Sequence, residues 1–255
     1  MFISAIDTHC HLHYGPKELL VPNVLTNIMQ EGNCYSAYWD KLSQISEAAH
    51  IDKIFISPFD GVLDPNYTEQ ANEKIFQIVK SIPSLYQWVV ITPQNDNSFL
   101  QAEQMLKDKK CVGIKIHPYC HKYSIDEYGD KIFSFAQKHR AVVQIHPQDE
   151  VDSIVRFANV YPNATYIMAH LGGEHYVNAI KNAKYGNVYT DTSGMASMKN
   201  MIVEYAVSQI GSERILFGTD TYSAAAQRGR IEFAMISERD KENILFHNAK
   251  LLFKF

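Results

Sequence analysis

Short runs of apolar and β-branched residues recur along the chain, and most of them show little alternation between hydrophobic and polar positions. A strand of a parallel sheet that is covered on both faces has this pattern, because neither side of the strand faces water. The runs therefore predict eight buried strands, at residues 2–6, 54–57, 88–92, 112–117, 141–146, 165–170, 188–191 and 215–220.

The segments between these runs have apolar residues at a spacing near 3.6, which is typical of helices with one buried face. Ala71, Ile75 and Val79 show this spacing. Ser98 and Ser124 are each followed three residues later by Gln or Glu, which is the pattern of a capping box at the start of a helix. Helices are therefore expected between the strands.

The alternation of strands and helices predicts one α/β domain over residues 1–255. Eight strand–helix units in 255 residues give about 32 residues for each unit, which fits a closed (β/α)8 TIM barrel. A doubly wound open sheet is the alternative, but such sheets more often have about five to seven strands.

The interval between the first two strands is longer than one helix requires. We expect a helix at 38–50, preceded by a long loop over residues 14–40 that contains two prolines, two glycines and several aromatic residues. A loop of this kind, placed after the first strand, could close over a substrate as a lid. A packed surface loop is an equally good interpretation.

Polar residues accumulate where the predicted strands end. At four of these ends a polar residue precedes proline, which stops a strand from pairing because it has no N–H to donate. The carboxyl ends of all barrel strands lie on one face, where active sites are found. We therefore expect the functional side chains on this face, in the segments 57–58, 92–93, 117–118, 146–147, 169–173, 191–194 and 218–220.

Composition narrows the functional classes. The chain has 24 Lys and Arg against 28 Asp and Glu, a net charge of −4, and 46% hydrophobic residues, which excludes disordered and collagen-like proteins and disfavours a binder of nucleic acid or anionic membranes. No apolar run approaches the ~20 residues of a membrane span, and no signal peptide is expected. The 4 cysteines show no C-x-x-C spacing, so we expect the protein to work in reducing cytoplasm. We expect its partner to be a small-molecule substrate.

The first strand leads into Asp7, His9 and His11, which share one side because side chains alternate along a strand. Two imidazoles at i and i+2 supply half of a transition-metal site. Other strand ends provide further donors that can converge with them, namely His146, His170 and Asp220. Three imidazoles and a carboxylate around a divalent cation leave a position open for water, as catalytic metal sites require.

The ordered set of motifs resembles the amidohydrolase superfamily. It comprises D-x-H-x-H, the segment 113–118 with Lys115 and His117, a histidine after the fifth strand, Ala-His-Leu-Gly-Gly at 169–173, and Gly-Thr-Asp at 218–220. The closest resemblance is to the amidohydrolase-related branch, which contains aminocarboxymuconate-semialdehyde decarboxylase and resorcylate-type decarboxylases beside hydrolases. This resemblance covers nearly the whole chain. It implies a (β/α)8 barrel with a divalent metal, Zn²⁺ being the first choice. Relatives of this kind often dimerise, so a homodimer is the expected partner assembly.

Individual roles follow from the resemblance. It implies that His170 either completes a second metal site or moves protons and polarises the substrate. Asp7 would orient a ligand imidazole through its far nitrogen. The position of Asp191 at the end of the seventh strand, and not the resemblance, suggests that it does the same for His170. Tyr222 stands where the family commonly has proline, which changes the rim of the site. The metal ligands implied are His9, His11, His146 and Asp220.

Lys115 has two interpretations. Lysines at this place in some relatives are carboxylated and bridge two metals, and His146 and His170 would then hold the second one. Alternatively, Lys115 stays cationic and contacts a substrate carboxylate, while His117 is a hydrogen-bonded residue of the rim. One metal is therefore expected, or two if the lysine is carboxylated.

The leading functional hypothesis is a hydrolase that uses metal-activated water on an amide, ester or lactone-like carbonyl. Asp220 would accept the proton of the water, and His170 or Lys115 would stabilise the oxyanion. A metal-dependent decarboxylase acting on an aromatic or enol acid is the alternative, although such relatives are usually longer than this chain. A barrel without activity that serves as a binding protein is the third possibility.

Overall fold

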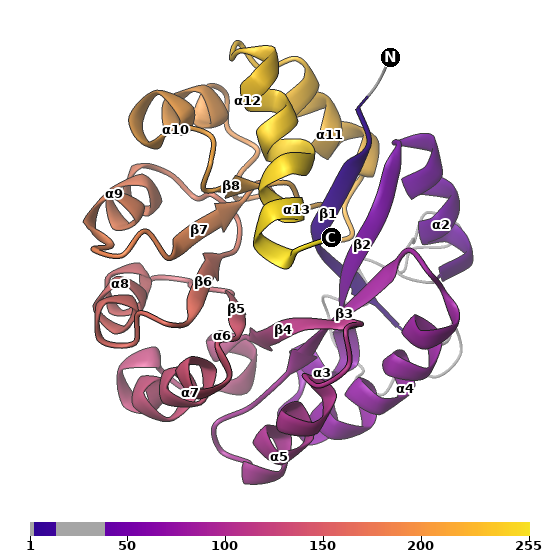
Figure 1. The fold of residues 1–255 in the computed structure, drawn as a ribbon, viewed down its shortest axis with the longest axis vertical. Coiled ribbons are helices and arrows are strands. Elements are labelled where there is room, and N and C mark those ends of the chain that lie inside the picture. The colour runs from indigo at the N-terminus through magenta and orange to yellow at the C-terminus, as the bar shows by residue number, and fades with distance from the viewer. Residues whose placement is uncertain (1–2, 14–38) are drawn as a thin grey trace.

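The computed structural model describes residues 3–13 and 39–255. Eight parallel strands pair in sequence order, β1 to β8, and helices surround them (Figure 1). The two edges of the sheet meet where Thr8 N donates to Phe217 O at 2.9 Å and Thr219 N donates to His9 O at 3.1 Å. The predicted (β/α)8 barrel is confirmed.

The strands are β1 (Ala5–Leu12), β2 (Ile51–Pro58), β3 (Leu85–Val90), β4 (Cys111–Ile116), β5 (Val142–Ile145), β6 (Thr165–Met168), β7 (Val188–Asp191) and β8 (Ile215–Leu216). The helices up to β6 are α2 (Trp39–Ala48), α3 (Phe59–Leu63), the 3₁₀ turn η2 (Pro65–Tyr67), α4 (Thr68–Ser81), α5 (Asp96–Met105), α6 (Pro118–His121), α7 (Ile125–His139) and α8 (Val151–Val160). After β6 follow α9 (Glu174–Asn182), α10 (Ile202–Ile210), α11 (Ala224–Glu232), α12 (Glu238–Glu242), the π-helical turn η3 (Asn243–His247) and α13 (Asn248–Phe253).

Most strands differ from the predicted ranges by one to three residues at an end, and two strands, the first and the last, differ by more. The first strand was expected at 2–6 but spans Ala5–Leu12, so the D-x-H-x-H motif lies inside the strand. The run 215–220 pairs only over Ile215–Leu216, because the residues that follow turn towards β1. Most of the predicted loop 14–40 falls on 14–38, outside the described residues.

One of the two predicted capping boxes is wrong. The side chain of Asn95, not of Ser98, caps α5 and accepts a hydrogen bond from Asn97 N. Ser98 lies inside the helix and donates to Thr92 O at 3.0 Å. Ser124 does cap α7, where its hydroxyl accepts from Glu127 N.

Apolar side chains fill the end of the barrel at which the strands begin. Phe55 and Trp88, both fully buried, belong to an inner cluster that α13 and the last residues close. The ring centroids of Phe55 and Phe253 are 4.8 Å apart, and Figure 1 shows α13 crossing this end. The interior of the barrel is therefore closed at this end, and it opens at the carboxyl ends of the strands. None of the described helices is long and apolar enough to cross a membrane.

Candidate active site

A cavity of about 230 Å³ opens at the carboxyl ends of the strands. One wall is apolar and comes from α3, with Phe59, Val62 and Leu63. The other wall is polar and carries side chains from five strand ends. It consists of His9, His11, Lys115, His117, His146, His170 and Asp220, with Tyr119, Cys120 and Tyr222 also lining the cavity. The structure thus brings the predicted metal ligands into one cavity.

The tightest group of possible metal donors contains His9, His170 and Asp220. One ligand atom from each of these residues lies within 4.8 Å of the other two. His9 Nε2 is 3.5 Å from Asp220 Oδ1, and the His9 and His170 rings stack with centroids 5.0 Å apart. His170 was not expected among the ligands of a single metal. In the structure, its ring nitrogen lies as close to Asp220 and His9 as a metal ligand would.

His11 and His146 border this group on either side. His11 Nε2 is 2.9 Å from Asp220 Oδ1, and His146 Nδ1 is 3.1 Å from His170 Nε2. The five side chains therefore form one continuous set of nitrogen and oxygen donors at the base of the cavity.

Asp191 and Ser193 orient the two stacked imidazoles. Asp191 Oδ2 is 2.9 Å from His9 Nδ1, and because an ionised carboxylate only accepts, His9 Nδ1 donates and Nε2 faces the cavity with its lone pair. Ser193 Oγ lies 2.9 Å from both His9 Nδ1 and His170 Nδ1. Asp191 contacts the backbone N–H of His170 at 3.1 Å, so its ring contact is with His9 and not, as expected, with His170.

Ser193 was not singled out from the sequence. A signal existed, because it stands two residues after Asp191 at a strand end and can therefore point to the same side. The contact with His9 could not be foreseen, since 184 residues separate the two side chains.

Asp7 contacts backbone and hydroxyl groups, not the predicted imidazole. It accepts from His9 N and Thr219 N, each at 3.0 Å, and from Thr219 Oγ1 at 2.6 Å. Burial raises the pKa of Asp7 to about 7, although the hydrogen bond from Thr219 acts to lower this pKa. Its observed contacts therefore tie β1 to the turn that carries Asp220.

Lys115 and His117 extend the polar wall from the end of β4. Lys115 is buried, with Nζ 3.2 Å from His9 Nε2. Burial lowers the pKa of Lys115 to about 8, although Asp220 and Asp191 favour its charged form.

His117 stacks on His146 with ring centroids 4.1 Å apart and caps α6 by accepting from Cys120 N. Tyr222 is 38% exposed at the rim.

The protonation states suit a metal cation. Burial lowers the pKa of His9 to about 4 and that of His146 to about 2, so both are neutral near pH 7. Burial alone would raise the pKa of Asp220, but the neighbouring His170 and the hydrogen bond from His11 hold this pKa well below its usual range. Neutral imidazoles and an ionised carboxylate are the forms that bind a divalent cation. The donor set therefore fits a divalent metal.

The backbone is strained at two residues of the site. His170 and Asp220 have φ of 64° and 56°, in the left-handed region that side chains other than glycine rarely adopt. Gly194 has φ of 71°, and a Cβ there would lie 2.7 Å from His170 Nδ1. Glycine is therefore required next to His170.

Comparisons with known proteins place the chain in a family. A family model described as amidohydrolase matches residues 6–255. No curated protein sequence matches the chain.

Solved structures share the fold over essentially the whole chain. The 2,6-dihydroxybenzoate decarboxylase complexed with 2,6-dihydroxybenzoate has a TM-score of 0.77 at 14% identity, with 100% of both chains covered. A dihydroxybenzoic acid decarboxylase from a Polaromonas species, with bound manganese and the inhibitor 2-nitroresorcinol, has a TM-score of 0.75 at 16% identity, covering 99% of this chain and 97% of that one. A probable 2-pyrone-4,6-dicarboxylic acid hydrolase from Acinetobacter baumannii, with citric acid bound, has a TM-score of 0.68 at 15% identity, covering 99% and 100%.

Proposed function

The chain belongs to the amidohydrolase family, and we propose that it is a metal-dependent carboxy-lyase that removes CO2 from a small aromatic or enol carboxylic acid. The observation that carries the proposal is the cavity of about 230 Å³, whose apolar wall faces a metal-competent polar wall. The similar decarboxylase structures support it, so the alternative of the sequence analysis now leads over hydrolysis. The length of this chain does not count against decarboxylation, because the structural match covers 100% of a decarboxylase chain.

The cavity accounts for binding of a flat acid. The ring of Phe59 lies 4.6 Å from that of His11, centroid to centroid, so the apolar and polar walls adjoin. A single aromatic ring would pack on Phe59, Val62 and Leu63, with its carboxylate directed at the opposite wall. Lys115 lies in that wall and would pair its ammonium with the carboxylate.

The metal would be held by Asp220 and by three imidazoles of the set His9, His11, His146 and His170. Bound there, a divalent cation would supply Lewis-acid stabilisation of negative charge on the substrate oxygens. Three imidazoles and one carboxylate favour Zn²⁺ in affinity over Mn²⁺, and manganese, as in the similar decarboxylase, is the alternative occupant.

The reaction requires one proton transfer. The bond between the ring carbon and the carboxylate carbon breaks, CO2 leaves, and the electron pair stays on the ring carbon, which must take up a proton. Asp220 and His170 face the cavity and would hold and deliver that proton. Loss of the carboxylate charge also removes the partner of Lys115, which favours product release.

Hydrolysis is the second candidate. The same cavity holds Asp220 as proton acceptor and Lys115 as a cation for an oxyanion, and one similar structure is described as a probable hydrolase of a pyrone dicarboxylic acid. The intact donor set favours an enzyme of either kind over a barrel without activity. The cytoplasmic location, the homodimer and the single domain over 1–255 stay predictions.

The products decide between the two reactions. The metal-loaded protein is incubated with 2,6-dihydroxybenzoate and related single-ring acids in D2O, and CO2 release and deuterium in the product are measured. We expect CO2 release with one deuterium at the carbon that lost the carboxylate. His146→Ala should abolish it, whereas His247→Ala, at an exposed residue outside the cavity, should not. Ring opening of 2-pyrone-4,6-dicarboxylate without CO2 release from any acid would contradict the proposal.

A further inference from the structure

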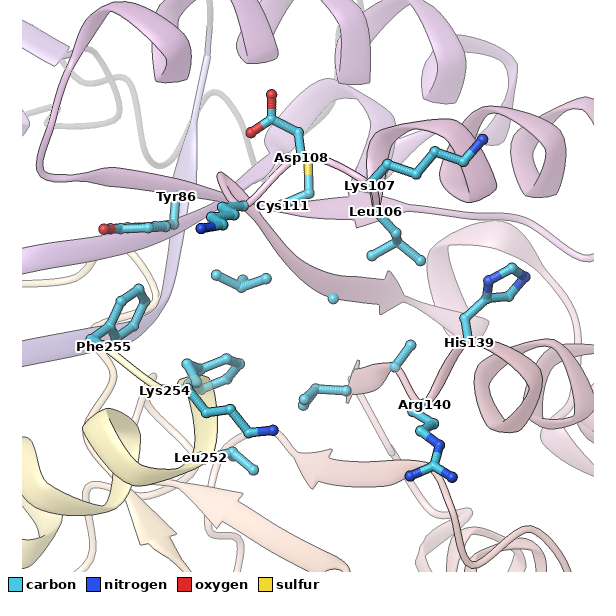
Figure 2. A pocket seen from close by; sticks show the side chains of 16 residues that line it. Tyr86, Leu106, Lys107, Asp108, Cys111, His139, Arg140, Leu252, Lys254 and Phe255 are labelled. Carbon is cyan, nitrogen blue, oxygen red and sulfur yellow. The ribbon is translucent and has the colours of Figure 1, made fainter.

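A second and larger cavity lies at the end of the barrel where the strands begin. Its volume is about 600 Å³, within the range of about 300–1,000 Å³ that is usual for small-molecule sites. The starts of β4 and β5 and the end of α13 border it, as Figure 2 shows. It is therefore separate from the catalytic cavity, which opens at the opposite ends of the same strands.

The floor and one edge of this cavity are apolar. Val112 and Val142 contribute from neighbouring strands, and Leu106 and Leu252 from the segments around them. In Figure 2, Tyr86 and Phe255 line one edge side by side, with ring centroids 4.7 Å apart. Such a surface can pack against an apolar body about one or two rings in size.

The rim of the cavity carries an excess of positive charge. Four cationic residues line it against one acidic residue, Asp108, and Figure 2 shows the Asp108 carboxylate turned away from the middle of the cavity. Arg140 and Lys254 lie along the edge opposite Asp108. Within residues 3–13 and 39–255, the ion pairs include no carboxylate partner for Lys109, Arg140 or Lys254.

Cations beside an apolar floor are complementary to an anion with an apolar body. Arg140 offers a planar guanidinium that can donate two parallel hydrogen bonds to a carboxylate or a phosphate. Lys254 adds a second charge on the same edge. Attraction between opposite charges is stronger next to apolar surface than in open water.

We propose that this cavity binds a small organic anion, a carboxylate or phosphate monoester attached to an apolar ring system, at a site distinct from the catalytic cavity. The ring system packs on Val112, Val142 and the Tyr86–Phe255 edge, and the anionic group pairs with Arg140 and Lys254. The proposal does not depend on which reaction the catalytic cavity performs.

The test uses 8-anilinonaphthalene-1-sulfonate, a fluorescent aromatic anion, titrated into the full chain. We expect saturable binding that weakens about tenfold or more in Arg140→Glu/Lys254→Glu, because two attractive charges become repulsive. The matched control is Lys184→Glu/Arg239→Glu, which makes the same change of net charge at exposed residues outside the cavity. Equal affinity in the two double variants would overturn the proposal.

Three further measurements use chains with an unchanged cavity rim. In the unmodified chain, affinity should fall as salt rises from 0.05 to about 0.5 M, because salt screens the charges. In His9→Ala/His11→Ala, affinity should be unchanged, and its loss would place the probe in the catalytic cavity and overturn the proposal. Displacement of the probe by 2-naphthoate or by 1-naphthyl phosphate then tells which anionic group the site prefers, and displacement by neither would also overturn it.

Discussion

At the residue level, the hydroxyl of Ser193 connects two imidazoles and one carboxylate of the site. Its hydroxyl touches His9 Nδ1, His170 Nδ1 and the Asp191 carboxylate, and it is fully buried. A hydrogen-bond partner on the far nitrogen of a ligand imidazole fixes its tautomer and orientation. Ser193 therefore acts through the imidazoles as a positioning residue.

Replacing Ser193 by alanine should weaken metal binding. We expect Ser193→Ala to lower metal affinity about 10- to 100-fold, because both imidazoles lose a shared partner. Competition against a chelator of known affinity measures the change. Ser208→Ala, at an exposed serine on α10, is the control and should bind metal normally. Metal affinity equal to that of the unmodified chain would show that Ser193 does not position the imidazoles.

Asp220 is the residue on which turnover should depend most. Asp220→Asn keeps an oxygen donor and a side chain that tolerates the left-handed backbone at φ of 56°, but it cannot hold the proton. We expect kcat to fall by about 10²- to 10⁴-fold, with an unchanged circular dichroism spectrum. Activity equal to that of the unmodified enzyme would refute its role in proton transfer.

At the level of elements, Arg228 joins α11 to the start of the barrel. The buried guanidinium donates to Ala49 O, His50 O and Ile3 O and pairs with Glu232 at 2.6 Å. It therefore links segments around β1 and β2 to a helix near the end of the chain.

Removal of this side chain should destabilise the barrel. Arg228→Ala removes one hydrogen-bond donor from each of three carbonyls and the ion-pair partner of a carboxylate, so we expect the free energy of unfolding to fall by about 2–3 kcal/mol. Urea unfolding followed by circular dichroism measures it. Arg239→Ala, at an exposed residue on α12, should change stability by less than about 0.5 kcal/mol. Equal stability of the two variants would contradict this account of α11.

The elements differ in how far the sequence could predict them. The buried runs of β2 to β7 and the helices between them follow from local periodicity. β1 was placed too early because its second half is polar, although every residue of this strand is buried. β8 was placed too long because a local pattern does not show where the chain turns to meet β1.

The site was predictable in position but not in its contacts. Barrel geometry brings all strand ends to one face, so the donors could be named in advance. The partnership of Asp191 with His9, 182 residues away, depends on how β7 and β1 lie around the closed barrel. For this reason Asp191, and not Asp7, orients an imidazole of β1.

For the whole molecule, the buried histidines make stability depend on pH. Burial lowers the pKa of His9 and His121 to about 4 and that of His146 to about 2, so between about pH 6.5 and 4 the unfolded chain binds protons that the folded chain does not. Asp7, with its raised pKa, acts in the opposite direction but is a single group.

The stability of the metal-free protein should therefore fall on acidification. We expect the free energy of unfolding to drop by a few kcal/mol from pH 7 to pH 4, since each pKa unit corresponds to about 1.4 kcal/mol. Urea titrations at fixed ionic strength measure the profile. A free energy of unfolding that stays constant or rises from pH 7 to pH 4 would contradict the conclusion that the buried imidazoles are neutral in the folded protein.

The measurement that tests the central claim most directly is the metal content per chain, by plasma mass spectrometry on protein purified without added metal or chelator. The account expects about one equivalent of a divalent metal, lost in His9→Ala/His11→Ala and retained in the control His247→Ala. About two equivalents would instead support a carboxylated Lys115 that bridges two ions. No metal, even after reconstitution with Zn²⁺ and Mn²⁺, would contradict the assignment of these strand ends as a metal centre.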